Sequence, residues 1–327
     1  MTQTTAAPAS ATTRVAPAFG LVVLALGIVY VVWGSTYLAI RVVVEQAPPL
    51  TSMGLRYLSA AVVLGTILAL RGGLRRLALT PKQALGTGFL GLMLPMLGNG
   101  MVSVGENLGA PSGVAALLIA VAPLMIVVFR TIEGDRPRPL SILGVLLGLA
   151  GLAVLVLIGS DSGVGNGFPV GAALLIMFAS TCWAFGSYSQ ARLWLPRDVF
   201  VTTVYEMLFG GLLLSTVGQL SGESFHAAAY GPRTWTALGY LIVFGSVVAF
   251  TSYVWLLANA PISFVATYAY VNPVVAVFLG WLILHEPVTL PVVVGGGIVV
   301  AAVALVITAE RPRRPRKETA QGAATER

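Results

Sequence analysis

The chain has 327 residues, of which 57% are hydrophobic and only 9% are charged. A soluble domain carries about 25% charged residues, so this chain has too few to cover a surface in water. The composition excludes a soluble enzyme, a nucleic-acid-binding protein and a disordered chain, and it predicts that lipid surrounds most of the molecule. The net charge of +7 does not indicate nucleic acid, because much of it lies in the basic run 311–317, which suits anionic lipid headgroups.

Residues 1–18 are rich in Ala, Thr and Pro and predict a disordered tail. Ten apolar segments follow, each long enough to cross a bilayer. They cover about 19–40, 50–70, 84–105, 112–132, 140–158, 170–190, 199–220, 234–258, 262–284 and 288–308. A basic tail, 309–327, comes last. The sequence therefore predicts an all-α integral membrane protein with ten transmembrane helices.

The distribution of positive charge predicts the orientation. If the N-terminus is cytoplasmic, 16 of the 19 lysines and arginines lie on the cytoplasmic side, and Arg233 alone lies outside. Arg41 and Arg56 lie within spans or at their ends. Cytoplasmic loops carry the excess of Lys and Arg in membrane proteins. We therefore expect a multi-pass protein of the cell (inner) membrane with both termini cytoplasmic.

The two halves of the chain echo each other at an offset of 150 residues. Trp33 and Trp183 are separated by this offset, and so are the mid-span prolines Pro123 and Pro273. The same offset separates Ala110-Pro111 from Ala260-Pro261, and Pro137 from Pro287. Each half, 19–158 and 170–308, holds five spans, and an odd number inverts the second copy. Inverted repeats are typical of secondary transporters, in which two copies exchange conformations to expose one site alternately.

Several short motifs carry a family resemblance. They are Trp33-Gly34-Ser35-Thr36-Tyr37, Leu55-Arg56-Tyr57, Gly109-Ala110-Pro111-Ser112-Gly113, Asn259-Ala260-Pro261, Asn272-Pro273 and His285-Glu286-Pro287. Together they resemble EamA-type members of the drug/metabolite transporter superfamily over about residues 19–308. The resemblance implies an inner-membrane carrier that exports small metabolites, often amino acids. It also implies a central cavity lined mainly by spans 1, 3, 4, 6, 8 and 9, with spans 5 and 10 peripheral.

Two ionisable residues lie deep in predicted spans. Arg56 lies about 9 Å into the second span and Glu206 about 10 Å into the seventh, at 1.5 Å per residue. Their offset is 206 − 56 = 150, so the repeat places them at mirrored depths, as candidates for gating, coupling or contact with a charged substrate. The alternative is structural: Arg56 pairs with Glu45 or Glu106, and Glu206 pairs with Arg192 or Arg197.

The two mid-span prolines, Pro123 and Pro273, predict helix kinks. Each removes a backbone donor and frees a carbonyl one turn earlier, which lipid tolerates only beside protein or a water-filled cavity. Asn272 precedes Pro273 and offers a donor and an acceptor there. The symmetric placement favours kinks that shape a cavity, and the alternative is a packing kink.

Aromatic and small polar residues in the cavity-lining spans are the candidate substrate contacts. They are Trp33, Tyr37, Asn99, Trp183, Ser187, Tyr188, Tyr253, Tyr270 and Asn272. Tyr and Trp near span ends are otherwise typical of the membrane interface. Gly144, Gly148 and Gly151 predict close helix packing within the chain or a dimer contact, so we expect a monomer or a homodimer.

The chemistry that the sequence lacks narrows the function. There is no GxxxxGK[ST] phosphate loop, no HExxH motif and only one cysteine, Cys182, so we expect neither a cofactor nor a metal site. The leading hypothesis is a secondary transporter that exports small polar metabolites or amino acids by alternating access. The alternatives are an integral-membrane enzyme acting on a lipid-linked substrate, and a passive channel.

Overall fold

A computed structural model describes residues 19–134, 136–154, 158, 169–260, 265 and 267–309. The predicted N-terminal tail lies outside the described residues, and so does the basic tail except for Ala309. Every regular element that the structure describes is helical. This agrees with the all-α architecture expected of a chain that must satisfy its backbone hydrogen bonds within lipid.

The first half contributes five helical segments to the described part. They are α1 (Phe19–Ile28) with α2 (Gly34–Val44), α3 (Pro49–Gly72), α4 (Pro81–Gly91) with α5 (Met101–Asn107), α6 (Ser112–Ile119) with α7 (Ala122–Ile132), and α8 (Pro139–Ala153). A π-helical segment, Val29–Trp33, joins α1 to α2. A second one, Leu92–Gly100, joins α4 to α5.

The second half repeats this order within the described residues. Its helices are α10 (Val170–Ser189), α11 (Val199–Leu220), α12 (Pro232–Tyr240) with α13 (Thr251–Asn259), α15 (Tyr268–Leu284) and α16 (Leu290–Ala309). The π-helical segment Leu241–Phe250 joins α12 to α13. Seven of the ten segments are long and apolar enough to cross a membrane, and Pro139–Ala153, Val271–Leu284 and Leu290–Val306 are shorter apolar helices.

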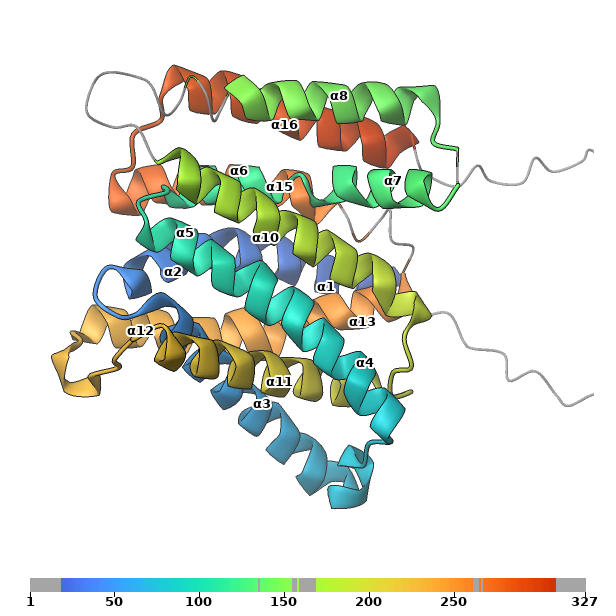
Figure 1. Cartoon of the computed structure of the whole chain (residues 1–327), viewed down its shortest axis with the longest axis vertical. Coiled ribbons are helices and arrows are strands. Elements are labelled where there is room, and N and C mark those ends of the chain that lie inside the picture. The colour runs from blue at the N-terminus through green and yellow to red at the C-terminus, as the bar shows by residue number, and fades with distance from the viewer. Residues whose placement is uncertain are drawn as a thin grey trace, which may run out of the picture.

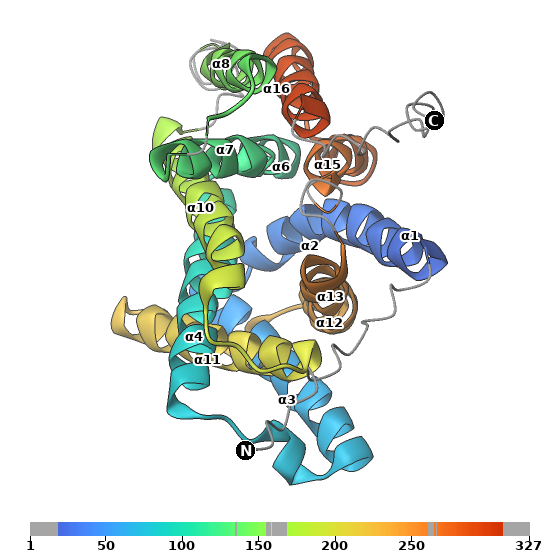
Figure 2. The same ribbon diagram turned by 90° about the vertical axis from the view of Figure 1, so that its right-hand side faces the viewer.

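A pair of helices lies at each of two opposite edges of the molecule, and the other helices lie between the two pairs (Figures 1 and 2). α8 and α16 lie together at one edge of the molecule, and α3 and α11 lie together at the opposite edge. Between them stand α1, α2, α4 to α7, α10, α12, α13 and α15. Spans 5 and 10 are therefore peripheral, as the family resemblance implied.

Helices at equivalent positions in the two halves pack against each other. α3 packs against α11, α8 against α16, and α6 against α15. Elements related by a two-fold axis contact each other only where they lie beside that axis. The packing therefore follows a pseudo-two-fold arrangement of the two repeats.

Glycines permit the closest of these contacts. A Cβ at Gly144 would lie 2.5 Å from the Val306 side chain, and one at Gly151 would lie 3.0 Å from the backbone oxygen of Gly295. A Cβ at Gly148 would lie 2.2 Å from the Leu124 side chain. The glycine face of α8 is thus packed within the chain, which excludes this face as a dimer contact and supports the packing interpretation.

The helix irregularities also follow the repeat. The π-helical segment Leu92–Gly100 maps onto 242–250 at the offset of 150, and the second half has its π-helical segment at Leu241–Phe250. Both lie in the middle of a span beside the centre of the bundle. π-Helical turns occur frequently at functional sites.

At one end of the bundle, side chains cap helices of the opposite half. This first end is where α2, α5 and α11 finish. The Glu223 carboxylate accepts hydrogen bonds from the backbone nitrogens of Leu50 (3.1 Å) and Thr51 (2.7 Å) at the start of α3. Glu286 accepts in the same way from the backbone nitrogen of Ser112 (2.8 Å) at the start of α6. A carboxylate suits a helix N-terminus because unpaired backbone donors point toward it.

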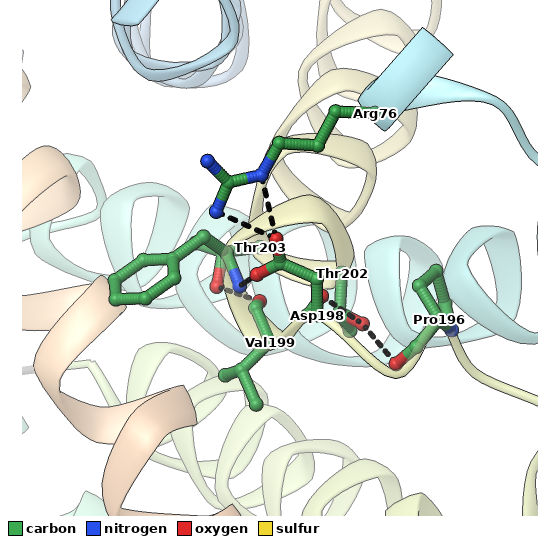
Figure 3. Close-up of polar contacts among 7 residues, drawn as sticks. Arg76, Pro196, Asp198, Val199, Thr202 and Thr203 are labelled. Carbon is green, nitrogen blue, oxygen red and sulfur yellow. Dashed lines mark hydrogen bonds and ion pairs between the residues drawn. The ribbon is translucent and has the colours of Figure 1, made fainter. Parts of the chain in front are cut away.

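At the second end, where α3, α7 and α10 finish, ion pairs join the segments. Figure 3 shows Asp198 beside the first turn of α11, where it accepts from Phe200 N (3.0 Å) and pairs with Arg76 (2.7 Å). Arg192 pairs with Glu133 at 2.7 Å. Carboxylate caps therefore join the two halves at the first end, and ion pairs join them at the second.

Candidate functional site

The two repeat-equivalent tryptophans meet in the middle of the molecule. The ring centroids of Trp33 and Trp183 are 5.4 Å apart in an edge-to-face arrangement, and each residue is 8% exposed. Because equivalent residues of two repeats touch only at the symmetry axis, this pair marks the axis. A site on the axis keeps similar surroundings when the two halves exchange conformations.

Further aromatic rings surround the tryptophan pair. The Tyr253 ring lies 4.7 Å from the Trp33 ring, and the Tyr268 ring lies 5.5 Å from it on another side. Phe250 lies 6.2 Å from Trp183. These centroid distances and tilted planes are those of favourable aromatic contacts. The cluster forms a firm, largely apolar wall.

A cavity opens beside this wall and has an empty volume of about 490 Å³ including its opening. It is lined by Trp33, Thr36, Tyr37, Arg56, Tyr57, Gly98, Asn99, Val102, Ile119, Trp183, Phe250 and Tyr268. These residues come from both halves and from spans 1, 2, 3, 4, 6, 8 and 9. Span 2, which supplies Arg56 and Tyr57, adds to the spans that the resemblance implied as the main lining.

Arg56 gives the cavity its charged group. It is 2% exposed; its Nε donates to Ser246 Oγ at 2.8 Å, and its Nη1 donates to Asn99 Oδ1 at 3.0 Å. Its Cζ lies 4.8 Å from the centroid of the Tyr57 ring, which is a cation–π contact. Gly245 leaves the room that the guanidinium needs, because a Cβ there would lie 3.0 Å from Nη2.

The ion pairs expected under the structural alternative for Arg56 are wrong. In the described part of the chain Arg56 forms no ion pair with Glu45 or Glu106. Arg41 is near both instead: its Nε lies 4.0 Å from Glu45 Oε1, and its Nη1 donates to the backbone oxygen of Glu106. The physical reason is that Arg56 lies on the face of α3 that packs toward Ser246 and Asn99.

Glu206 is fully buried on α11, and its carboxylate oxygens have no hydrogen-bond partner among the described residues. The expected pairing with Arg192 is wrong, since Arg192 pairs with Glu133. No ion pair of Glu206 with Arg197 is present in the described ranges either. Glu206 does not line the two described cavities, although its charge lies within electrostatic range of Tyr253.

The other candidate contacts divide into two groups. Ser187 lines a smaller cavity beside the tryptophan pair, together with Pro123, Tyr253 and Tyr268, and its Oγ lies 2.8 Å from the Tyr253 hydroxyl. Tyr188 lies outside both cavities at the second end, where it donates to Glu133 and stacks under Arg192. Its place on the last turn of α10 points it toward that ion pair, so the structure does not support Tyr188 as a cavity residue.

Pro123 lies beside a helix break, and Asn272, next to Pro273, connects two spans. The fourth span breaks between α6 and α7, and Pro123 lies in the first turn of α7, whereas Pro273 lies inside α15. The Asn272 carboxamide, oriented to satisfy both groups, donates to the backbone oxygens of Tyr30 (3.1 Å) and Tyr268 (3.3 Å). Asn272 therefore joins span 9 to span 1. The side chain of Tyr270 lies outside what the structure describes.

Sequence reasoning missed several residues of this region. Ser246, Tyr57 and Phe250 were not expected near the site, and Ser246 is the polar partner of Arg56. Glu106 is fully buried near the first end, and its carboxylate oxygens have no hydrogen-bond partner among the described residues. Glu106 and Glu206 are therefore both buried carboxylates without a hydrogen-bond partner in the described ranges. The sequence signal that could have identified Ser246 was its position beside Gly245 in an otherwise apolar stretch.

Within the part of the chain that the structure describes, no group of three or more His, Cys, Asp or Glu side chains could hold a metal ion. An inverted pair of five-helix repeats with a cavity on the repeat axis defines a class, the helical membrane transporters with internal repeats.

Comparisons with known proteins give the family. The family model described as the EamA-like transporter family matches residues 19–157 and 170–308. The chain is 38% identical over 291 residues to the uncharacterized inner membrane transporter YedA of Escherichia coli K12, covering 89% of this chain and 90% of YedA. It is 25% identical to the uncharacterized transporter YvbV of Bacillus subtilis, covering 89% and 93% of the two chains. A crystal structure with 21% identity has a TM-score of 0.62 and covers 88% of this chain and 96% of its own.

The chain belongs to the EamA-like transporter family, within the drug/metabolite transporter superfamily. It is a multi-pass inner-membrane transporter with two EamA repeats, and its predicted fold is confirmed. Members of this family are transporters and not enzymes, which removes the membrane-enzyme alternative.

Proposed function

We propose that this protein is a secondary carrier that exports a small polar metabolite or an amino acid by alternating access, with both termini in the cytoplasm. The observation that carries the proposal is the contact between Trp33 and Trp183 on the repeat axis, beside a cavity built from both halves. Such a site can face either side of the membrane while its own contacts change little. The units that move are the two five-helix repeats, 19–158 and 170–308.

The two ends supply contacts that can act as gates. The caps of Glu223 and Glu286 join the halves at the first end, and the pairs Arg76–Asp198 and Arg192–Glu133 join segments at the second. Alternating access requires one end to open while the other stays closed. Because both sets consist of polar contacts reachable from water, each can break without exposing charge to lipid.

Counterflow in proteoliposomes tests the carrier. Cells that overproduce the protein identify a candidate cargo by what accumulates outside them, and that cargo is then loaded into liposomes. A saturable, trans-stimulated uptake supports a carrier. Flux at channel rates without counterflow would support the passive-channel alternative and contradict the proposal.

Cysteine labelling tests the orientation. In a Cys182-free background, Arg76→Cys and Arg314→Cys are each expected to stay inaccessible to an impermeant reagent added outside intact cells. Labelling at either position from outside would contradict cytoplasmic termini. Arg233→Cys, on the predicted outer side, serves as the accessible control because its side chain is exposed.

Pro123 and Pro273 are proposed to shape the cavity. Pro123 lines the smaller cavity at a helix break, and Asn272 beside Pro273 bridges spans 9 and 1. Pro123→Ala and Pro273→Ala are expected to lower transport more than expression. Normal transport by both variants would mean that the two prolines serve only packing.

Glu206 is proposed to tune transport and to carry a coupling proton. The support is its full burial without a hydrogen-bond donor among the described residues, since such a carboxylate in a membrane is a candidate proton-binding group. Trp33, Tyr37, Asn99, Trp183, Ser187, Tyr253 and Asn272 are proposed to line or support the substrate site. The protein acts in this proposal as a monomer or a homodimer.

A further inference from the structure

The positive charge of Arg56 is not matched by a carboxylate. A guanidinium stays protonated in proteins, so its charge is permanent. α3 carries no acidic residue, and the acidic residues of the helices packed on it are Glu206 on α11 and Glu106 on α5. Neither forms an ion pair with Arg56 in the described part of the chain. A permanent charge is therefore held at membrane depth by neutral partners alone.

The guanidinium also keeps donors in reserve. Nε donates to Ser246 and Nη1 donates to Asn99, whereas Nη2 makes no hydrogen bond to the described residues. Nη2 fills the space beside Gly245, where a Cβ would lie 3.0 Å from it, and Arg56 is part of the cavity wall. Buried charges in membrane proteins are normally paired with an opposite charge or hydrogen-bonded. The guanidinium of Arg56 has hydrogen bonds but lacks a negatively charged partner among the described residues.

Aromatic side chains make up about half of the cavity lining. The Tyr57 ring lies beside the guanidinium, and Trp33, Trp183 and Phe250 line the same cavity. A molecule that satisfies both features carries a negative group at one end and a planar or apolar body at the other. A carboxylate fits the charged part, because a guanidinium binds it through parallel N–H···O bonds in one plane.

We infer that Arg56 is an anion-binding residue and that the cargo is a small carboxylate with an apolar or aromatic body. That the bound molecule is transported rests on the proposed carrier function, but the anion-binding site itself does not depend on transport. Of the roles that the sequence left open for Arg56, which were gating, coupling and contact with a charged substrate, this inference selects the last.

A charge series on one scaffold tests the site. Benzoate, benzamide and benzylamine have similar size and differ in charge at neutral pH. Each is titrated into the purified full chain in detergent, and binding is followed by quenching of tryptophan fluorescence, since Trp33 and Trp183 line the cavity. We expect benzoate to bind at least about tenfold more tightly than benzamide, and benzylamine to bind most weakly.

Four variants complete the test. Arg56→Gln is expected to reduce benzoate binding to the level of benzamide, and Arg56→Lys is expected to keep part of the preference. Arg233→Gln removes an exposed arginine outside the cavity and serves as the matched control, with unchanged preference. Trp33→Phe is expected to reduce the quenching amplitude, which locates the probe beside Trp33.

The outcomes are distinct. Equal binding of the three probes, binding of none, or a benzoate preference retained in Arg56→Gln would each overturn the anion site. If Arg56→Gln fails to fold, the charge series on the unaltered protein decides alone. Benzoate binding without counterflow of any metabolite would preserve the anion site and remove the carrier. Counterflow without preference for anions would preserve the carrier and remove the anion site.

Discussion

The regions around Arg56 and Glu206 occupy equivalent places in the two halves, and their chemistry is opposite. Each residue is the eighth of its helix, counted from Pro49 in α3 and from Val199 in α11. Arg56 bonds to Ser246 and Asn99 and fits beside Gly245. At the offset of 150, these three positions become Met96, Ala249 and Pro95 around the place of Glu206.

The difference teaches that duplication preserved the backbone while the two sites diverged. Ser246 and Asn99 give the guanidinium oxygen acceptors, whereas Met96 and Ala249 offer no strong hydrogen-bond donor to a carboxylate. The Arg56 region therefore holds a charge and adjoins the cavity. The Glu206 region holds an unpartnered acid outside it. We propose that one repeat position became a recognition site and that its mirror became a site suited to holding a proton.

The largest effect is expected from removing the charge at the Arg56 region. Arg56→Met should lower counterflow about tenfold to a hundredfold, because hydrogen bonds to charged groups contribute about 1.5–3 kcal/mol. Its thermal unfolding midpoint should not fall in proportion, since the variant also removes the unfavourable burial of a charge. If Arg56→Met lowers the unfolding midpoint but leaves counterflow by the folded protein unchanged, Arg56 serves stability and not recognition. The proposed difference between the Arg56 and Glu206 regions would then be wrong.

A smaller loss is expected from filling the space beside the guanidinium. Gly245→Val should displace Arg56 and Thr36, with a penalty of about 1–3 kcal/mol that is typical of overpacking. Benzoate titration should show the loss. Gly239→Val is the matched control on the preceding helix, because a Cβ there meets nothing within 4 Å. Equal effects of the two variants would show that helix propensity, and not the space near Arg56, matters.

Removing one partner of Arg56 should have a modest effect. Ser246→Ala deletes the acceptor for Nε, and a typical hydrogen bond contributes about 0.5–1.5 kcal/mol, so benzoate should bind about threefold to tenfold more weakly. Ser252→Ala, whose Oγ bonds only to the Val248 carbonyl, should leave binding unchanged. A Ser246→Ala protein that binds benzoate normally would show that Asn99 alone positions the guanidinium.

The smallest effect on exchange is expected at the mirror site. Glu206→Gln keeps the shape and removes only the titration, so counterflow should stay within about twofold, since no hydrogen bond is lost. The response of transport to an imposed pH gradient should disappear. An intact pH response would remove the coupling role, and failure of the variant to insert would make Glu206 structural.

Much of the architecture followed from the sequence. The ten spans, the repeat at 150 residues, the peripheral position of spans 5 and 10 and the family were all predicted, and the structure and comparisons agree with them. Hydrophobic length and repeated spacing are properties of the chain in linear order, and lipid permits few ways to satisfy a backbone. Trp33 and Trp183 could be proposed as partners because the offset related them before any contact was known.

Only the tertiary structure decided which way each polar side chain faces. Tyr188 and Ser187 are neighbours in the sequence, but Tyr188 joins an ion pair at the second end while Ser187 contacts Tyr253. Likewise Arg56 turns to Ser246 and Asn99 and leaves the acidic residues proposed for it to Arg41. A uniformly apolar span has no polar stripe to mark its inner face. The rotation of each helix is therefore fixed by its packing against neighbours that lie far away in the sequence.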